Sequence, residues 1–287
     1  MKPPERRRIR RILVALDASA DSEAALELSA GLAARLGAEL VGVYVEDDSL
    51  VGVAGLPFAQ EVSSLSGRPR PLQARILRDQ LKALGRRSRE RLRGVAEVHR
   101  ITWSFRTVQG RPAVRLRELA EEADLVTLGI RGRTPGRGPG STTLALGTRG
   151  RIPTLVAPRN RRAGKTVHVL YDGSGAGREA LVTATELARA SGQNLVVLLP
   201  YDGSDEGGGL EEEARKLLQD LEAASGETKV ASALQKLSTL DPIHLGDALI
   251  RGHSDLLVLP RSAVAQGGRL DPWAVAIKGG CSLLLVG

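Results

Sequence analysis

The chain has 287 residues, a net charge of +8, an apolar content of 42% and an aromatic content of only 2%. This length suggests two domains, and the aliphatic composition suits helices packed on a buried parallel sheet, whereas base-stacking nucleic-acid modules need exposed aromatic side chains. No apolar run reaches the roughly 18 residues of a membrane span, and the segment after the basic N-terminus is too short for a signal peptide. We therefore expect a cytoplasmic protein with no membrane partner.

The first elements follow from residues 11–45. The aliphatic run 11–16 predicts a strand buried on both faces. The next segment, 17–36, has apolar residues at helical spacing, with Ser19 or Asp21 as its N-cap, and 38–45 predicts a second strand.

A long connection, 46–74, follows the second strand. A connection of this length inside a compact domain is usually functional or mobile. Its apolar cluster at 56–58 is expected either to dock a surface excursion or to cover the mouth of a pocket.

The remainder of the first half alternates between helix and strand. Residues 75–99 predict a basic amphipathic helix, whose inward side chains are expected to be Ile76, Leu77, Leu81, Leu84, Leu92 and Val95. The other expected elements are strands at 101–108, 124–129 and 154–158 and helices at 112–123 and 141–150.

The chain contains an internal repeat. Residues 12–45 and 167–200 align without gaps at an offset of 155, which places Asp17 on Asp172 and Ser19 on Ser174. Two later matches continue the repeat: 123–129 with 254–260, and 154–158 with 283–287. The repeat predicts domains at 1–158 and 165–287, joined by the polar linker 159–165. Each is expected to be a Rossmann-like α/β domain with an open five-stranded parallel sheet and helices on both faces.

Charge is divided unequally between the halves. Residues 1–160 hold 28 Lys and Arg against 17 Asp and Glu, whereas residues 161–287 hold 13 against 16. The basic helix 75–99 is interpreted as a solvated face rather than a nucleic-acid surface, although a basic half can also attract an anionic partner.

A glycine-rich stretch, "GIRGRTPGRGPGS" at 129–141, follows one expected strand and precedes a helix. Ligands of open α/β sheets bind beyond the carboxyl ends of the strands, where Asp17, Val45, Gly129 and Gly132 are expected to lie. Glycines allow backbone N–H groups to approach phosphate closely, and the "GST" at 140–142 opens a helix N-terminus, which is an anion site. Positive charge would come from Arg131, Arg133 and Arg137.

The chain resembles a tandem member of the universal stress protein (UspA) superfamily, whose fold is adenine nucleotide alpha hydrolase-like. The resemblance covers nearly the whole chain and is carried by "ILVALDASADSEAAL", "ADLVTLGIRGR" and "GSTTLALGTRGRIPTLVAP". ATP-binding members carry Gly-x2-Gly-x9-Gly-Ser/Thr. Here Gly129, Gly132, Gly140 and Ser141 match, but seven residues rather than nine separate Gly132 from Gly140.

This resemblance implies an ATP site, with Mg²⁺ accompanying the nucleotide, in the first half. The residues implied are Ala15 and Leu16 on the adenine side, Asp17 facing the adenosine end, Val45 contacting adenine through its backbone, Gly129 and Gly132 around ribose and phosphates, and Gly140, Ser141 and Thr142 at the phosphates, with Leu128 and Arg131 also in the site. The shortened bridge leaves open whether Ser141 still reaches a phosphate.

The second half departs from the pattern. Pro260 and Ala263 replace the two leading glycines, so this half is interpreted as a structural and dimerisation partner. The resemblance implies an intrachain pseudo-dimer, with the strand at 154–158 pairing edge to edge with the last strand of the chain. Association of two chains into a homodimer stays open.

Three functions remain in competition. The first is a stress-response module that binds an adenine nucleotide. The second is a weak ATP hydrolase, although no Walker motif is present and no lysine occurs between Lys82 and Lys165. The third is a nucleotide-independent protein whose basic half docks an anionic partner such as RNA or an acidic protein. Cys281, the one cysteine, is expected to be a small buried hydrophobe, and the four histidines show no metal-ligand spacing.

Overall fold

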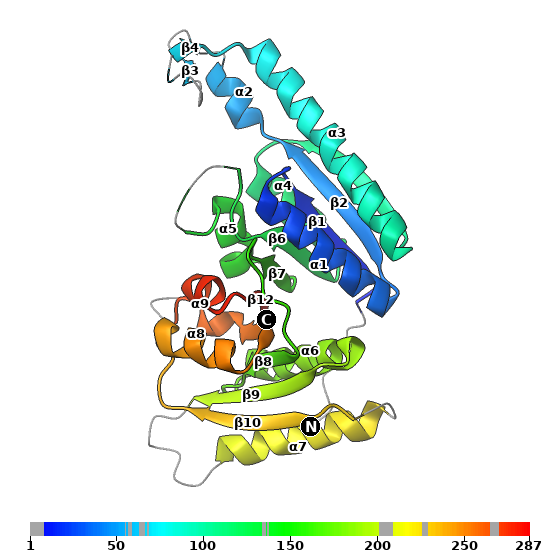
Figure 1. Cartoon of the computed structure of the whole chain (residues 1–287), viewed down its shortest axis with the longest axis vertical. Coiled ribbons are helices and arrows are strands. Elements are labelled where there is room, and N and C mark those ends of the chain that lie inside the picture. The colour runs from blue at the N-terminus through cyan, green and yellow to red at the C-terminus, as the bar shows by residue number, and fades with distance from the viewer. Residues whose placement is uncertain are drawn as a thin grey trace.

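The structure is a computed structural model that describes residues 9–54, 56, 59–62, 67, 69–133, 136, 138–200, 209–225, 229–264 and 270–287. In this part of the chain, ten strands form one continuous sheet through an elongated molecule, with the first half at one end and the second half at the other (Figure 1). The expected α/β fold, with five parallel strands from each half, is confirmed.

The sheet has the order β10-β9-β8-β11-β12-β7-β6-β1-β2-β5. The first half supplies β1 (Arg11–Leu16), β2 (Glu39–Glu46), β5 (Trp103–Gln109), β6 (Leu125–Gly129) and β7 (Thr154–Ala157). The second half supplies β8 (Thr166–Leu170), β9 (Asn194–Pro200), β10 (Ser232–Leu237), β11 (Ser254–Pro260) and β12 (Ser282–Val286). In both halves the first strand lies between the second and the fourth, so each half places its own β1-type strand at the switch point of the sheet.

The two halves meet where β7 and β12 pair. These strands run antiparallel, with Leu155 opposite Leu284, whereas the pairs within each half are parallel. This is the edge-to-edge pairing expected for residues 154–158, and it removes two exposed strand edges from the molecule.

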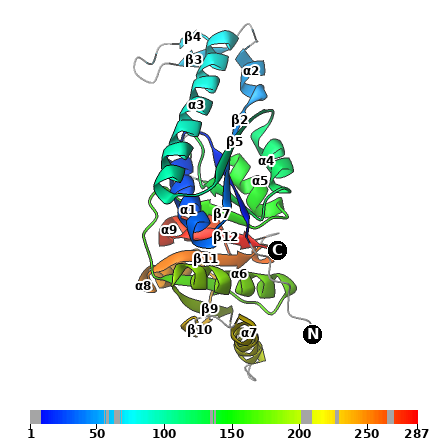
Figure 2. The same ribbon diagram turned by 90° about the vertical axis from the view of Figure 1, so that its right-hand side faces the viewer.

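Helices cover both faces of the sheet (Figure 2). One face carries α1 (Ala20–Leu36) and α3 (Ala74–His99) of the first half and α6 (Gly175–Ser191) and α7 (Gly209–Ser225) of the second, all in one apolar core. The other face carries α4 (Pro112–Ala120), α5 (Ser141–Arg149), α8 (Pro242–Arg251) and α9 (Pro272–Gly279). A short 3-10 helix, η1 (Arg261–Ala263), follows β11.

Local signals place the first helix as expected. The Ser19 side chain accepts a hydrogen bond from the backbone N–H of Ser22, at 3.1 Å, and so caps α1. Gly37 ends the helix in the left-handed conformation, with φ of 65°, which is easy only for glycine. The second half repeats this arrangement with Ser174 and Gly192 around α6.

The 46–74 connection contains elements that sequence reasoning missed: α2 (Asp48–Ala54) and the two short antiparallel strands β3 (Gln60–Val62) and β4 (Pro69–Pro71). The expected docking residue Phe58 lies outside the described residues. The prediction that Ile76 points inward is wrong, because its side chain is 46% exposed at the start of α3, which projects beyond the sheet.

The linker 159–165 lies against both halves. The backbone N–H of Arg159 donates to Asp21 of α1 at 3.0 Å, and the Arg161 guanidinium pairs with Asp255 at 2.7 Å. Gly164 is packed so closely that a Cβ would stand 2.3 Å from the carbonyl oxygen of His253, so only glycine fits there.

Candidate functional site

A cavity of about 220 Å³ opens at the carboxyl ends of β1, β2 and β6. The structure brings all eleven site residues predicted from the sequence to this cavity: Ala15, Leu16, Asp17, Val45, Leu128, Gly129, Arg131, Gly132, Gly140, Ser141 and Thr142. Five lining residues were not predicted: Ser22, Val43, Pro112, Leu116 and Thr143. The start of α4 after β5 is a signal that would have pointed to Pro112, because that helix begins at the same end of the sheet.

The cavity has two chemically different ends. Side chains of Val43, Val45, Leu116 and Leu128 form an apolar part between β2, β6 and α4. The other end consists of the glycine-rich turn after β6 and the first residues of α5. Such a cavity suits a ligand with a flat apolar body and an anionic tail.

The two ends of the glycine-rich bridge lie side by side. The backbone N–H of Gly140 donates to the carbonyl oxygen of Ile130 at 2.9 Å, and the Thr143 hydroxyl donates to that of Gly129 at 2.8 Å. A Cβ on Gly140 would lie only 3.3 Å from the backbone nitrogen of Gly132. The seven-residue bridge therefore still closes on itself, while its residues 134, 135 and 137, including Arg137, lie outside the described residues.

In the described part of the chain, the N-terminus of α5 has no side-chain cap. Gly140 stands at the N-cap position in an extended conformation and has no side chain with which to accept a hydrogen bond. The first N–H groups of a helix have no acceptor within that helix, and they carry its positive dipole end. Because Ser141 and Thr142 also line the cavity, α5 offers it backbone and hydroxyl donors together.

Asp17 is the one carboxylate that lines this cavity in the described part of the chain. Its Oδ1 accepts a hydrogen bond from the backbone N–H of Ser19 at 2.9 Å, which fixes the side chain at the start of α1. Its Oδ2 faces Gly132, where a Cβ would stand 3.3 Å away. No group of three or more His, Cys, Asp or Glu side chains gathers among the described residues, so a cation here would need oxygen atoms from a ligand.

Arg131 brings an unsatisfied donor to the same place. Its Nε atom is buried and has no hydrogen-bond partner among the described residues, although the residue as a whole is half-buried and lines the cavity. A buried donor without an acceptor is costly, and an anionic group in the cavity would remove that cost.

Gly129 has a packing role besides its place at the cavity. A Cβ there would lie 2.6 Å from the backbone carbon of Asp21, so β6 and α1 approach each other more closely than any side chain allows. Tyr44, on β2, is also buried, and its ring lies where Gly85 of α3 leaves room. Burial raises the pKa of Tyr44 to about 12, so this phenol stays neutral beside the site.

Comparison with known proteins decides the family. The model of the universal stress protein family matches residues 8–158, just over half of the chain. The chain belongs to the universal stress protein family. The structure of a universal stress protein from Archaeoglobus fulgidus has a TM-score of 0.68 to this chain at 14% identity, over 96% of this chain and 97% of that one.

A functionally unknown protein from Pseudomonas aeruginosa PAO1 has the same arrangement, with a TM-score of 0.54 at 14% identity over 96% of this chain and 92% of its own. No curated protein matches the sequence. At such identities these likenesses show the fold alone, and the universal stress protein fold therefore extends over both halves.

The second half presents a different surface at the corresponding place. Pro260 ends β11, and α9 begins after Asp271, whose carboxylate accepts hydrogen bonds from the N–H groups of Trp273 and Ala274 at 3.0 and 3.1 Å. The N-terminal dipole of α9 is thus satisfied by a side chain of this universal stress protein itself.

No helix in the described part of the chain combines the length and apolar character needed to cross a bilayer.

Proposed function

We propose that the first half of this universal stress protein binds an adenine nucleotide, with the base in the apolar part of the cavity and the phosphates at the N-terminus of α5. The observation that carries the proposal is the adjacency of Gly132 and Gly140 at an uncapped helix start. Backbone N–H groups at such a turn, together with the helix dipole, bind phosphate oxygens.

The residues at the cavity fit each part of that ligand. Val45 and Leu128 line the apolar part of the cavity, which would accept the base, and the Nε of Arg131 has no partner among the described residues and would face the phosphates. Asp17 would hold Mg²⁺ jointly with phosphate oxygens, since magnesium usually retains waters and takes one or two carboxylates. The bound cation would supply charge neutralisation for the phosphates.

Equilibrium binding of Mg-ATP tests the proposal. Gly132→Val places a branched side chain against Asp17 Oδ2, in the turn that lines the cavity, so we expect affinity to fall at least about tenfold through lost backbone contacts. Gly136→Val, in the same bridge but with no atom of the described residues within 4 Å of its Cβ position, is the matched control and should bind like the wild type. Absence of Mg-ATP binding by the wild-type protein would overturn the proposal.

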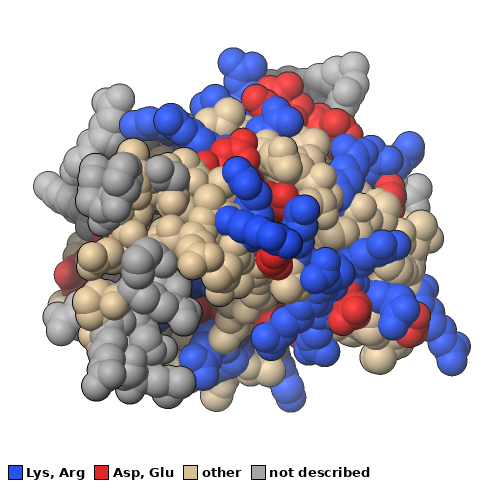
Figure 3. Space-filling view, turned by 90° about the horizontal axis from the view of Figure 1, so that it is seen from above, with Lys and Arg blue, Asp and Glu red and all other residues tan. Residues whose placement is uncertain are grey.

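A second candidate function rests on the basic surface of α3. Figure 3, which looks down on the end of the molecule that carries this helix, shows Lys and Arg side chains over much of the face. A basic stripe at helical spacing runs along α3, and its members, all exposed, are Arg75, Arg78, Lys82, Arg86, Arg89 and Arg93.

The stripe is a straight row of charge about 27 Å long, given 1.5 Å per residue. It lies on the flank of α3 away from α1, because Arg91 on the opposite flank pairs with Glu27 of α1 at 2.7 Å. Apart from Arg93, which lies 3.8 Å from Glu97, the members of the basic stripe form no ion pair with another described residue. This row would attract an anionic macromolecule independently of nucleotide.

Salt dependence separates this function from the first. Binding of a labelled single-stranded RNA should weaken steeply with added salt and be lost on combining Arg78→Glu with Arg86→Glu. Lys216→Glu with Arg251→Glu makes the same charge change in the second half and should leave binding nearly unchanged. Equal losses in both double variants would show that net charge alone attracts the RNA, and would remove the basic stripe as a binding surface.

A further inference from the structure

A second and separate cavity, of about 350 Å³, lies at the amino ends of β6 and β7. Its apolar lining comes from Ala120, Val126, Leu146 and Ile152. Its rim carries three arginines, Arg117 of α4 and Arg149 and Arg151 at and after the end of α5, together with Glu121. We refer to it as the arginine cavity.

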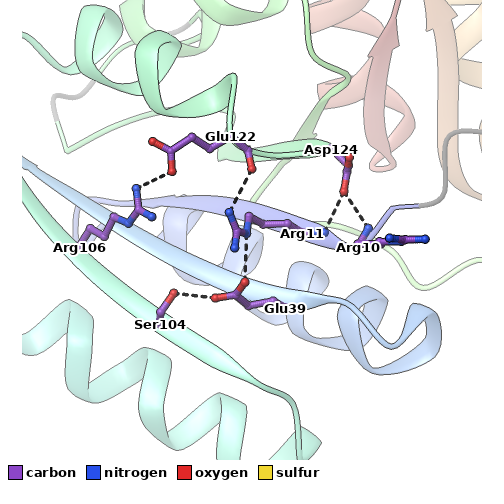
Figure 4. Close-up of polar contacts among 7 residues, drawn as sticks. All are labelled: Arg10, Arg11, Glu39, Ser104, Arg106, Glu122 and Asp124. Carbon is purple, nitrogen blue, oxygen red and sulfur yellow. Dashed lines mark hydrogen bonds and ion pairs between the residues drawn. The ribbon is translucent and has the colours of Figure 1, made fainter.

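The carboxylates nearby along this edge of the sheet already have partners (Figure 4). Arg11 pairs with Glu39 at 3.0 Å, and Arg106 pairs with Glu122 at 2.8 Å. The carboxylate of Asp124 accepts the backbone N–H groups of residues 10 and 11. Within the described part of the chain, none of the three arginines of the arginine cavity forms an ion pair, either with these groups or with Glu121.

The second half has an ion pair at the position that corresponds to the arginine cavity. Pro112 and Pro242 open α4 and α8, so Arg117 corresponds to Asp247. Arg149 corresponds to Lys278, because each precedes the matched last strand by five residues. Lys278 pairs with Asp247 at 3.2 Å. The first half instead has two guanidinium groups at these positions, an arrangement that repels itself unless an anion lies between them.

We propose that the arginine cavity binds a small molecule with two or more phosphate groups. Guanidinium groups bind phosphate oxygens in bidentate fashion, and the three arginines that line this cavity form no ion pair with a described residue. The apolar lining would accept the remainder of such a ligand. This binding does not depend on the nucleotide function proposed above, since the arginine cavity and the first cavity share no lining residue.

The same two helices line both cavities. Leu116 of α4 and Thr143 of α5 face the first cavity, whereas Arg117 and Leu146, on the same helices, face the arginine cavity. Ligand in the arginine cavity would therefore restrain α5, whose N-terminus forms the anionic end of the first cavity. This coupling, unlike the binding itself, rests on the proposed nucleotide function.

Calorimetric titration with inorganic tripolyphosphate tests the binding. We expect the wild-type chain to bind the probe and the affinity of one site to fall at least about tenfold on combining Arg149→Ala with Arg151→Ala, since two charge-assisted contacts disappear. Lys216→Ala with Arg251→Ala removes the same charge from exposed positions of the second half and should leave the affinity unchanged. An unchanged affinity in the first pair, or an equal loss in both, would overturn the proposal.

Two further variants complete the test. Arg117→Asp gives the first half the ion-pair arrangement of the second, so it should abolish tripolyphosphate binding while leaving the unfolding transition intact. Gly132→Val, which disturbs only the first cavity, should still bind tripolyphosphate. If Gly132→Val abolishes binding and the arginine variants do not, the probe occupies the N-terminus of α5 and the arginine cavity is not its site.

Discussion

The two halves share one fold but treat the start of their last helix in opposite ways. In the second half Asp271 caps α9 with its own carboxylate, and in the first half Gly140 leaves α5 without a side-chain cap. These two residues hold equivalent places, because each directly precedes the first residue of its helix, Ser141 or Pro272. The second half thus satisfies the N-terminal dipole of α9 with its own side chain, whereas the N-terminal dipole of α5 in the first half is available to a ligand.

The junction shows a second contrast. The residue after β6 is Ile130, which packs into the apolar core of the second half, whereas the residue after β11 is Arg261, which reaches into the first half. The buried Arg261 guanidinium donates to the carbonyl oxygens of Gly147, Ile152 and Gly287 at 2.8 to 2.9 Å. The first half therefore contributes an apolar contact to the junction, and the second half contributes the charge-assisted hydrogen bonds of Arg261.

Removing the Arg261 hydrogen bonds should have the largest effect on stability. Arg261→Ala leaves buried carbonyl groups without donors and opens a cavity, so we expect the free energy of unfolding to fall by about 3 to 5 kcal/mol. Urea denaturation followed by circular dichroism measures this. Arg251→Ala, an exposed arginine of the same half, should change stability by less than about 0.5 kcal/mol. A loss no larger than that in Arg261→Ala would show that the junction does not depend on this side chain.

At one buried position the matched first strands differ in polarity, with Leu13 in β1 and His168 in β8. Burial lowers the pKa of His168 to about 4 from its ordinary 6.5. As the pH falls from 6.5 towards 4, the histidine binds a proton in the unfolded chain but not in the folded chain. The free energy of unfolding therefore decreases as the pH falls through this range. Between pH 7 and pH 4.5, the free energy of unfolding of His168→Leu should therefore fall by about 2 kcal/mol less than that of the wild type. Denaturation experiments at the two pH values measure this difference. Identical pH profiles would contradict this assignment.

Glycine substitutions separate packing from helix propensity. Gly129→Ala forces β6 away from α1 and should cost about 2 kcal/mol of unfolding free energy. Gly94→Ala, in the exposed middle of α3 with nothing within 4 Å of its Cβ position, should instead stabilise the protein by about 1 kcal/mol. Thermal unfolding of the two variants decides the point, and a shift of the same sign in both would be inconsistent with the close approach seen at Gly129.

The smallest effect on stability comes from exchanging the caps. Asp271→Ala should cost about 1 kcal/mol, because two N–H groups of α9 lose their acceptor. Gly140→Asp should cap α5 and weaken Mg-ATP binding at least about tenfold, because its carboxylate takes the donors and repels phosphate. Gly140→Asn, which caps without charge, should weaken Mg-ATP binding less. Stronger Mg-ATP binding by Gly140→Asp than by wild type would contradict the interpretation that the start of α5, unlike that of α9, is left for a phosphate.

Local patterns were sufficient for much of this protein. The alternation of short aliphatic runs with amphipathic segments indicated the strands and helices, and the repeat indicated two copies of one parallel unit. Strand ends in such a unit meet at one edge, so residues as distant as Asp17 and Gly140 could be assigned to one cavity from the sequence alone. The 46–74 connection was harder, because α2 and the β3–β4 pair are short and have weak periodicity.

What the sequence determined by itself was the fold, the duplication and eleven of the residues that line the first cavity. The fold and the duplication follow from periodicity and the order of elements, and the eleven residues follow also from the family resemblance. Only the tertiary structure decided whether the shortened bridge closes, because the approach of Gly132 to Gly140 depends on hydrogen bonds to Ile130 and Gly129 rather than on residue spacing. It also decided that Arg261 crosses between the halves and that Arg117 lines one cavity with Arg149 at the end of α5. Such contacts join residues far apart in the chain, and packing alone brings them together.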